Sequence, residues 1–218
     1  MGEWFAGVIT KMQEVQWYTW LTVALLFLAG IILILSGRNS KWNSKRLAYA
    51  AMCIAISFVL SYIRLFRLPQ GGSITLLSTL PIILFSVAFG PVQGFVVGCA
   101  YGLLQLLQDM YVIHPIQMLM DYPLGFGALA LAGLVNFMPL NKWMKLPVAI
   151  LLGSLGRLAL TTMSGVIFFS SYALELGQAP LIYSLIYNGS YIGVEAALGI
   201  LVSFIPATQR LSTSLKTA

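Results

Sequence analysis

The stretch Tyr111-Val-Ile-His-Pro-Ile-Gln-Met-Leu-Met-Asp-Tyr122 places polar and charged side chains inside a sequence that is otherwise almost entirely apolar. Pro115 suits the first turn of a helix, where a missing backbone N–H costs nothing. In a helix that begins there, Gln117, Asp121 and Gly125 share one face. Asp121 then lies about 9 Å along the axis from the helix start. A carboxylate at that depth in a bilayer is costly without a partner, and we expect the partner to be a bound cation.

Composition places the chain among multi-pass helical membrane proteins. Of its 218 residues 59% are hydrophobic and 8% are charged, and the mean hydropathy is +0.90. A soluble domain of this size does not need so much apolar surface. The net charge of +6 comes from basic residues in short loops, which indicates membrane topology and not nucleic-acid binding. Cys53 and Cys99 lie in apolar runs, so we expect packing and neither a disulfide nor a metal site.

Seven apolar segments are candidate spans, and they cover residues 17–35, 47–65, 74–90, 92–108, 115–139, 146–170 and 181–205. Alternate threading gathers eight basic residues on one side, namely Arg38, Lys41, Lys45, Arg46, Lys142, Lys145, Arg210 and Lys216. The positive-inside rule therefore predicts an N-terminus outside and a C-terminus in the cytosol. Residues 67–73, 109–114 and 170–180 then fall on the outer face.

These outer connections carry most of the polar chemistry. Gln70-Gly-Gly-Ser73 is interpreted either as a plain turn or as a lid over an outer pocket. We interpret Asp109 as a solvated helix end. His114, the only histidine, is interpreted as a capping or lid residue. It forms no nucleophile-and-base arrangement with Asp109 and Ser170, so an enzyme is not expected.

The last two segments carry further polar side chains. Tyr183, Tyr187 and Tyr191 recur every four residues, a stripe that serves either packing at the membrane interface or a ligand site. Arg157 and Glu195 lie at similar distances from the inner ends of their segments. Because their depths match, we predict a buried ion pair between them.

Ala51 and Ala55 are small residues one helical turn apart in the segment 47–65. Such spacing lets helix backbones approach closely in lipid. The pair either packs against another helix of the same chain or docks onto a separate subunit.

Four motifs occur together in this order: Gln70-Gly-Gly-Ser-Ile-Thr75, His114-Pro-Ile-Gln-Met-Leu-Met-Asp-Tyr122, Ser164-Gly-Val-Ile-Phe-Phe169 and Tyr183-Ser-Leu-Ile-Tyr-Asn188. Over residues 47–205 the chain resembles the thiamine-specific substrate-capture (S) component of energy-coupling factor (ECF) vitamin transporters. The resemblance implies an all-α membrane domain of six helices, here residues 41–218, with residues 1–40 as an additional N-terminal transmembrane helix.

The resemblance also implies a function and partners. An S component in the bacterial plasma membrane binds its vitamin at the outer face with high affinity and hydrolyses nothing itself. A transmembrane coupling subunit and two cytosolic ATPases drive transport, and Ala51 and Ala55 match the motif that docks the coupling subunit. Neither cofactor nor metal is implied. A self-sufficient proton-coupled carrier using Asp121 and Glu195 is the alternative, although the sequence has no internal repeat of the kind many carriers show.

Ligand-binding positions follow from the same resemblance. Asp121 and Tyr122 match an acid–tyrosine pair that contacts the thiazolium half of the ligand. Tyr111, Tyr183 and Asn188 match further contact positions. The chemistry of the residues agrees, because a quaternary aromatic cation is bound by a carboxylate together with aromatic faces.

Two positions depart from the family pattern. Thr161 stands where the family has a ligand-contacting histidine, and Phe169 stands where a tryptophan can stack on the pyrimidine. Phenylalanine preserves stacking with less area, whereas threonine removes a larger polar partner. Thiamine, a thiamine precursor and pyridoxine therefore stay open as ligands. The complete predicted site is Asp121, Tyr122, Tyr111, Tyr183, Asn188, Phe169, Thr161, Gln117 and His114, with Gln117 and Asn188 as directional hydrogen-bonding groups.

Overall fold

The computed structural model describes residues 42–217, so the predicted first span lies outside the described residues. The helices are α3 (Ser44–Tyr62), α4 (Leu80–Phe89), α5 (Pro91–Gln108), α6 (Pro115–Leu119), α7 (Gly125–Gly127), α8 (Lys142–Phe168), α9 (Ser170–Glu175), α10 (Pro180–Ser203) and α11 (Pro206–Thr217). Tighter or wider turns form η1 (Pro69–Gly71), the π-helical η2 (Met120–Leu124) and η3 (Ala128–Phe137). The strands are β1 (Arg64–Arg67) and β2 (Ser73–Thr75).

Several helices begin where the sequence supplies a cap. The Asn43 side chain accepts a hydrogen bond of 2.8 Å from the backbone N–H of Arg46 and starts α3. Asn141 accepts a bond of 2.9 Å from the N–H of Met144 at the start of α8. Proline is the first residue of α5, α6, α10 and α11, where its missing N–H has no partner to lose.

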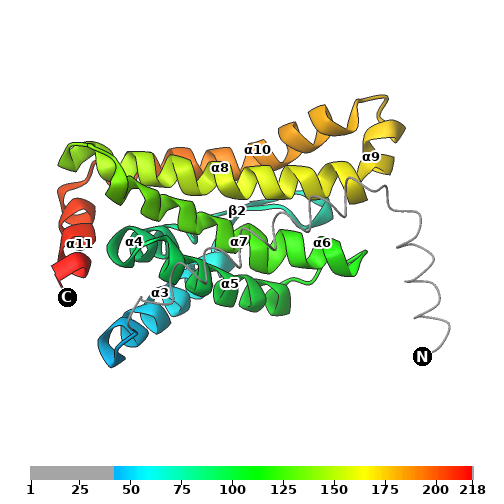
Figure 1. Cartoon of the computed structure of the whole chain (residues 1–218). Coiled ribbons are helices and arrows are strands. Elements are labelled where there is room, and N and C mark those ends of the chain that lie inside the picture. The colour runs from blue at the N-terminus through cyan, green and yellow to red at the C-terminus, as the bar shows by residue number, and fades with distance from the viewer. Residues whose placement is uncertain (1–41, 218) are drawn as a thin grey trace. The chain divides into compact units, whose positions relative to one another are not determined.

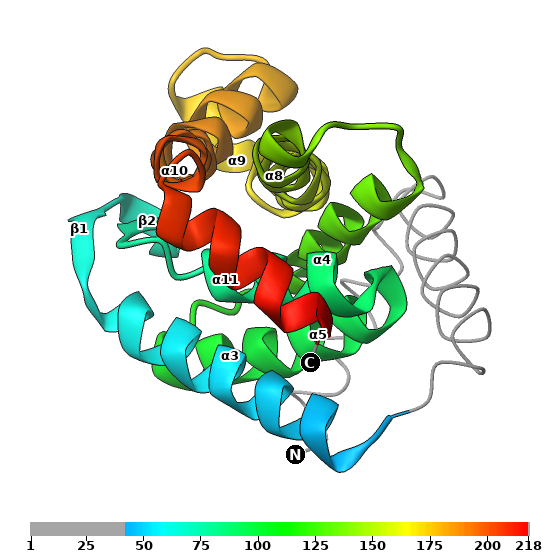
Figure 2. The same cartoon turned by 90° about the vertical axis from the view of Figure 1, so that its left-hand side faces the viewer.

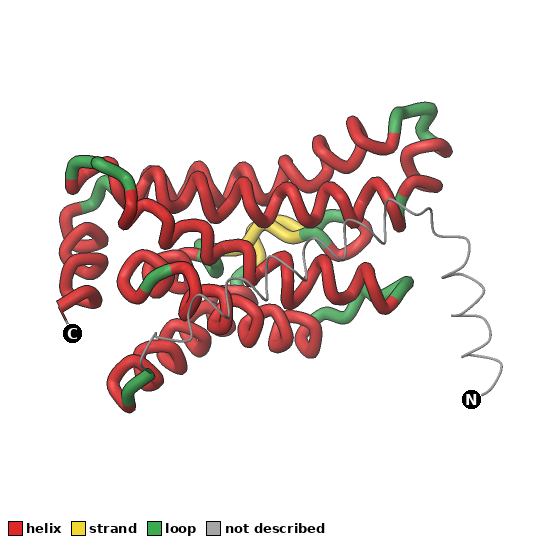
Figure 3. The backbone as a smooth tube through the Cα atoms, viewed as in Figure 1, coloured by secondary structure: helices red, strands yellow, loops and turns green. Residues whose placement is uncertain are grey.

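The helices form two groups with the hairpin between them. The long helices α8 and α10 pack side by side, and α8 also contacts η3 (Figure 1). On the other side α4 packs against α3, α5 and η3. Figure 3 shows the two strands lying between these groups. The amphipathic α11 crosses one end of the bundle and contacts α4 and α10 (Figure 2). The core is apolar, and Phe85, Tyr101 and Leu129 are among its most buried members.

Four helices of the described region are long and apolar enough to cross a membrane, namely Ser44–Tyr62, Pro115–Phe137, Lys142–Phe168 and Pro180–Ser203. The predicted span 74–90 differs from expectation, because its start is a strand and its helix α4 has ten residues. Ten helical residues rise about 15 Å, roughly half of the hydrocarbon thickness. The helix α4 is nonetheless mostly apolar, as suits a segment that neighbouring helices bury, so hydropathy overestimated the length of the span.

The strand hairpin corrects the expectation of an all-α chain. β1 and β2 pair antiparallel, with Arg67 opposite Ser73. Pro69 cannot continue a helix or a central strand, and Gly71 takes a φ of +91° that lets the chain reverse. Pairing the two strands satisfies backbone groups that would otherwise lack partners inside a membrane domain.

The segment 115–137 is one path built from several helical forms. It begins as α6, passes through the π-helical turn η2 and continues through α7 into η3. Pro123 lies inside this turn, where its ring disturbs regular α-helical bonding. A Cβ on Gly98 or Gly102 of α5 would collide with the backbone of this segment, so the two glycines permit the close approach. The irregular turn holds Asp121 and Tyr122.

Candidate functional site

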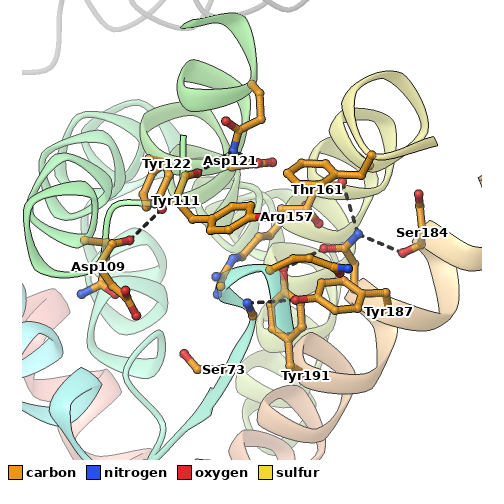
Figure 4. A pocket seen from close by; sticks show the side chains of 18 of the residues that line it. Ser73, Asp109, Tyr111, Asp121, Tyr122, Arg157, Thr161, Ser184, Tyr187 and Tyr191 are labelled. Atoms are coloured by element: carbon orange, nitrogen blue, oxygen red, sulfur yellow. Dashed lines mark hydrogen bonds between the residues drawn. The ribbon is translucent and has the colours of Figure 1, made fainter. Parts of the chain in front are cut away.

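One cavity of about 120 Å³ gathers most of the predicted site. It is bounded by the hairpin tip, the end of α5, the 109–114 connection, η2, α8 and α10. Eight of the nine predicted residues line it: Asp121, Tyr122, Tyr111, Tyr183, Asn188, Phe169, Thr161 and Gln117. In Figure 4 the labelled rings of Tyr111 and Tyr187 come from opposite walls, with Asp121 and Arg157 between the walls.

Asp121 is the acidic group of this cavity, and Gln117 orients it. The Gln117 amide nitrogen donates a hydrogen bond of 2.6 Å to Asp121 Oδ2, as expected for two residues on one helix face. None of the ion pairs in the described part of the chain includes Asp121. The carboxylate therefore faces a cavity lined by aromatic rings without being in an ion pair, although Arg157, which pairs with Glu195, lines the same cavity.

Both amide N–H donors of Gln117 are engaged within the chain, and its oxygen also accepts one hydrogen bond. Its nitrogen also donates to the Tyr111 carbonyl (3.1 Å), and its oxygen accepts from the Ile113 N–H (3.1 Å). With only 1% of its surface exposed, Gln117 ties the 109–114 connection to the acid. Its geometry is that of a positioning residue, whereas the sequence suggested a directional contact to the ligand.

Tyr122 also uses its hydroxyl on the backbone. It donates to the Asp109 carbonyl at 2.8 Å and accepts from the Tyr111 N–H at 2.9 Å. The ring lines the cavity while the hydroxyl shapes the connection above it. This arrangement leaves the aromatic face of Tyr122 as its available contact surface.

The mouth of the cavity carries an ion-pair cluster. Asp109 Oδ2 lies 2.7 Å from Arg64 Nη1, and its Oδ1 lies 2.9 Å from Arg67 Nη2. Asp109 is the C-cap of α5, so the predicted helix end is confirmed, but its carboxylate is not merely solvated, because β1 brings both arginines to it. The cluster joins the end of α5 to the hairpin.

Arg157, which lines the cavity, and Glu195 confirm the predicted buried ion pair. Their nearest atoms are 4.0 Å apart, with side chains 12% and 5% exposed. The Arg157 guanidinium also lies 4.0 Å from the centre of the Phe126 ring, a cation–π distance. One Glu195 oxygen accepts from the Thr75 hydroxyl (2.9 Å) and the Thr79 N–H (3.1 Å). Arg157 therefore lines the site, although the sequence predicted only an ion pair for this residue.

An aromatic group forms the outer wall. Phe169 stacks on Tyr111 at 6.0 Å and on Tyr172 at 6.2 Å between ring centres. The hydroxyls of Tyr111 and Tyr172 are 3.2 Å apart. This hydrogen bond and partial desolvation raise the pKa of Tyr111 above its ordinary value. Tyr111 therefore stays a neutral phenol at physiological pH.

The tyrosine stripe of α10 holds the tip of the hairpin. Tyr183 donates to the Gln70 side chain at 3.0 Å. The Tyr187 hydroxyl donates to the Pro69 carbonyl and accepts from the Gly72 N–H at 3.0 Å. The tip lines the cavity, so the stripe is both a wall of the site and an anchor for the segment above it.

Asn188 and Thr161 are engaged with their own helices and with each other. The Asn188 amide nitrogen donates to the carbonyls of Thr161 (3.3 Å) and Ser184 (2.9 Å). Its oxygen accepts from the Tyr191 hydroxyl at 2.8 Å. The Thr161 hydroxyl donates to the Arg157 carbonyl at 3.1 Å. The amide therefore links α8 to α10 in this structure.

His114 lies outside the group that lines the cavity. It caps α6, where its Nδ1 accepts from the Ile116 N–H at 3.1 Å, and it stacks on Phe168 at 4.9 Å. The capping interpretation is confirmed, whereas the structure does not bring His114 to the predicted ligand positions. Packing against Phe168 fixes the orientation of the His114 ring, and the His-Pro motif did not predict this contact.

The sequence missed several cavity residues. Arg64 comes from the hairpin, whose pairing no sequence pattern indicated, and Phe126 follows the π-helical turn, whereas Gln70 belongs to the stretch interpreted as a turn or a lid. Tyr187 belongs to the stripe, and its periodicity was the signal that could have added it. Among residues 42–217, His, Cys, Asp and Glu side chains form no group of three that could hold a metal ion.

The sequence matches the family described as thiamine transporter protein (Thia_YuaJ) over residues 47–215. The chain belongs to this thiamine transporter family. Thiamine transporter ThiT of Bacillus subtilis (strain 168) is 34% identical over 166 residues, which cover 71% of this chain and 85% of that protein. The solved structure of ThiT from Listeria monocytogenes superposes with a TM-score of 0.64 at 25% identity, covering 78% of this chain and 96% of that one.

A second solved structure supports the fold alone. The S component for biotin from an ECF-type ABC transporter superposes with a TM-score of 0.54 at 19% identity, covering 79% of this chain and 95% of that chain. Together these matches confirm the family resemblance drawn from the four motifs. The chain is a multi-pass bacterial membrane protein of a family of thiamine transporters with an S-component fold, and this family is not one of enzymes.

Proposed function

We propose that this chain binds thiamine, or a closely related pyrimidine or pyridine vitamin, at its extracellular side as the substrate-specificity subunit of an ECF-type importer. The observation that carries the proposal is the Asp121 carboxylate, which lacks an ion-pair partner in the described region and faces a cavity walled by aromatic rings. The chain is similar to ThiT of Bacillus subtilis and to the solved structure of ThiT from Listeria monocytogenes. These two relatives support thiamine as the first ligand to test.

The physical basis is the match between the cavity and an aromatic cation. Each cation–π contact contributes about 0.5–2 kcal/mol, with the larger values in desolvated sites. Attraction to the carboxylate strengthens as water leaves the cavity. Tyr111, Phe169 and Tyr183 offer ring faces around Asp121, so the two effects act on the same ligand.

Sidedness follows from the positive-inside rule. We infer that the cavity end lies outside and that α11 lies at the cytosolic surface, because the basic residues Lys45, Lys142 and Arg210 gather at the opposite end. In this arrangement α4 and α5 complete six membrane segments of the described region, and the predicted additional span over residues 1–40 lies outside the described residues. The hairpin tip then serves as an extracellular lid, held closed by Tyr183 and Tyr187.

The decisive experiment is thiamine titration of the purified protein with Asp121→Asn. We expect affinity to fall roughly 30- to 5,000-fold, because removing one partner of a desolvated charge pair costs about 2–5 kcal/mol. Glu175→Gln makes the same chemical change at an exposed acid of α9 and should leave binding unchanged. Equal affinities for the Asp121 variant and the native protein would reject the proposal. Hydroxymethylpyrimidine and pyridoxine titrated in parallel identify the preferred ligand.

Docking of a coupling subunit is assigned to α3. Ala51 and Ala55 are both exposed on this helix, which supports contact with a separate subunit over packing within the described part of the chain. Replacing both Ala51 and Ala55 by Phe should abolish thiamine uptake and co-purification of the coupling subunit while thiamine binding stays intact. Met52→Phe, on an adjoining exposed face of α3, is the matched control. Uptake that is retained when Ala51 and Ala55 are both replaced by Phe would contradict the assignment of α3 as the docking helix.

The alternative of a proton-coupled carrier is less well supported by the geometry. Glu195, one of its two proposed proton sites, faces Arg157 and accepts hydrogen bonds from Thr75, Ser78 and Thr79. A residue fixed by so many partners is suited to a structural role. Vesicles that contain this chain alone test the choice: proton-driven uptake would support the carrier, and binding without uptake would support the subunit.

A further inference from the structure

A second cavity lies at the other end of the bundle, away from the candidate binding site. Its volume is about 220 Å³, and it lies where α4, the start of α8 and α11 meet. The end-on view of Figure 2 shows α11 crossing this end of the molecule, in front of α4. On the proposed orientation, this end faces the cytosolic leaflet.

The lining of this cavity divides into an apolar and a polar part. Val87, Leu140 and Leu146 form the apolar part. The polar part consists of Lys142 and Lys145 from the first turn of α8 and of Gln209, Ser212 and Thr213 from α11. Two ammonium groups, two hydroxyls and an amide thus border a space that also has a hydrocarbon wall.

The two lysines are not neutralised by acids of the described region. Neither takes part in an ion pair there. The four acidic side chains of residues 42–217 lie elsewhere: Asp109 and Asp121 at the outer cavity, Glu175 on α9 and Glu195 beside Arg157. An anion that enters the cavity therefore meets positive charge without competing carboxylates from residues 42–217.

The backbone adds to this positive field. Lys142 opens the 27-residue helix α8, whose first turn has N–H groups without intrahelical acceptors and the positive end of the helix dipole. Asn141 caps one of these groups by accepting from the Met144 N–H. Basic pockets between transmembrane helices on the cytosolic side bind the head groups of anionic lipids.

We propose that this cavity binds a phosphate group, carried either by an anionic phospholipid of the inner leaflet or by a free phosphate ion. Lys142 and Lys145 neutralise the charge, and the Ser212 hydroxyl donates a hydrogen bond to a phosphate oxygen, whereas the Thr213 hydroxyl already donates to the Gln209 carbonyl. In the lipid case, the wall formed by Val87, Leu140 and Leu146 contacts the acyl chains. The site is separate from the vitamin cavity and relies only on the proposed orientation.

The test compares two double variants of the full-length chain that lose the same charge at the same end. Lys142→Gln with Lys145→Gln changes the cavity, whereas Lys45→Gln with Arg210→Gln changes exposed basic residues outside its lining. Native mass spectrometry measures phosphatidylglycerol retained from mixed micelles with phosphatidylcholine. We expect retention to fall about tenfold in the cavity variant and to change little in the control.

Two further arms make the result decisive. Inorganic phosphate added to the native protein distinguishes the sources: displacement of phosphatidylglycerol by phosphate, or a rise in melting temperature with phosphate alone, assigns the site to the free ion. Retention that phosphate does not displace assigns it to the lipid. Lys142→Arg with Lys145→Arg keeps the charge and should restore retention, which separates phosphate binding from a folding defect.

The proposal is overturned if both glutamine double variants lose phosphatidylglycerol equally, because general surface charge then explains the retention. It is also overturned if the cavity variant retains phosphatidylglycerol as the native protein does and phosphate changes the melting temperature of both proteins equally. Thiamine titration of the same samples should show unaltered affinity. Failure of the vitamin-binding proposal would appear in that titration, and failure of the phosphate site would appear in the lipid measurement.

Discussion

The two cavities at opposite ends of the described bundle use charge in different ways. At the outer end Asp121 is oriented by Gln117, and Gln117 is itself held by the backbone of Tyr111 and Ile113. At the inner end Lys142 and Lys145 border their cavity without an ion pair in the described residues. The outer charge lies within a fixed network, whereas the inner charges lie on long side chains at a helix start.

This difference indicates what kind of ligand each cavity can select. A network that fixes a carboxylate among rings selects a ligand by shape, charge and aromatic surface, because little reorganisation is needed on binding. Flexible lysines select chiefly for negative charge. We therefore expect ligand-specific, salt-insensitive effects from variants at the outer end, and smaller, salt-sensitive effects at the inner end.

The strongest way to break the outer network is Arg157→Met. It leaves Glu195, which is 5% exposed, without its cation, and removing one partner of a buried pair costs about 3–5 kcal/mol. Thermal or denaturant unfolding in detergent should show this loss of stability. Arg67→Met removes a partner of Asp109 that is 60% exposed and should cost about 1 kcal/mol or less. Equal losses of stability in the two variants would show that the buried pair at the outer end contributes no more than the exposed one.

Gln117→Leu sharpens the comparison by removing the group that orients Asp121. We expect thiamine affinity to fall roughly 5- to 150-fold, because breaking a buried hydrogen bond and leaving its partners unsatisfied costs about 1–3 kcal/mol. Isothermal titration measures the effect. Gln178→Leu, at an exposed position near α9, is the control. Unchanged affinity in the Gln117 variant would mean that the carboxylate needs no internal support.

Tyr187→Phe tests the smallest of these effects, the anchor of the hairpin tip. The ring remains, while the bonds to the Pro69 carbonyl and the Gly72 N–H are lost. A net cost of about 0.5–1.5 kcal/mol for the closed tip predicts ligand release about 2- to 10-fold faster in stopped-flow fluorescence. Tyr62→Phe alters an exposed tyrosine of α3 and should leave release unchanged. If both variants release ligand at the native rate, the tip is a plain turn.

Much of the candidate site could be read from local patterns. The spacing of Gln117 and Asp121 predicted one helix face, and their hydrogen bond has that geometry. Matching depths predicted the pair of Arg157 and Glu195. These inferences succeeded because helix periodicity and the cost of isolated charge in lipid are properties of short segments. Pro115, the first residue of α6, likewise indicated where that helix begins.

Other features depended on contacts between distant segments. β1 brings Arg64 and Arg67 to Asp109, more than forty residues away along the chain. Strand pairing is decided by which segments meet in space, and the residues 64–75 show no alternating pattern that would have predicted it. The hydrogen bonds that engage the Asn188 amide and the Tyr122 hydroxyl within the chain could not be predicted either, because packing decides which groups a side chain meets.

The sequence by itself determined that this is a helical membrane protein, which segments are apolar, and that an acid lies among tyrosines near one end. Hydropathy and periodicity act residue by residue, so a single chain reveals them. The tertiary structure was needed to show that Asp121 faces a cavity without an ion-pair partner in the described region. It was also needed to show that Gln117 orients Asp121, that Tyr122 holds the 109–114 connection, and that His114 lies apart. Those outcomes depend on which surfaces bury one another, and that choice is made by the whole fold.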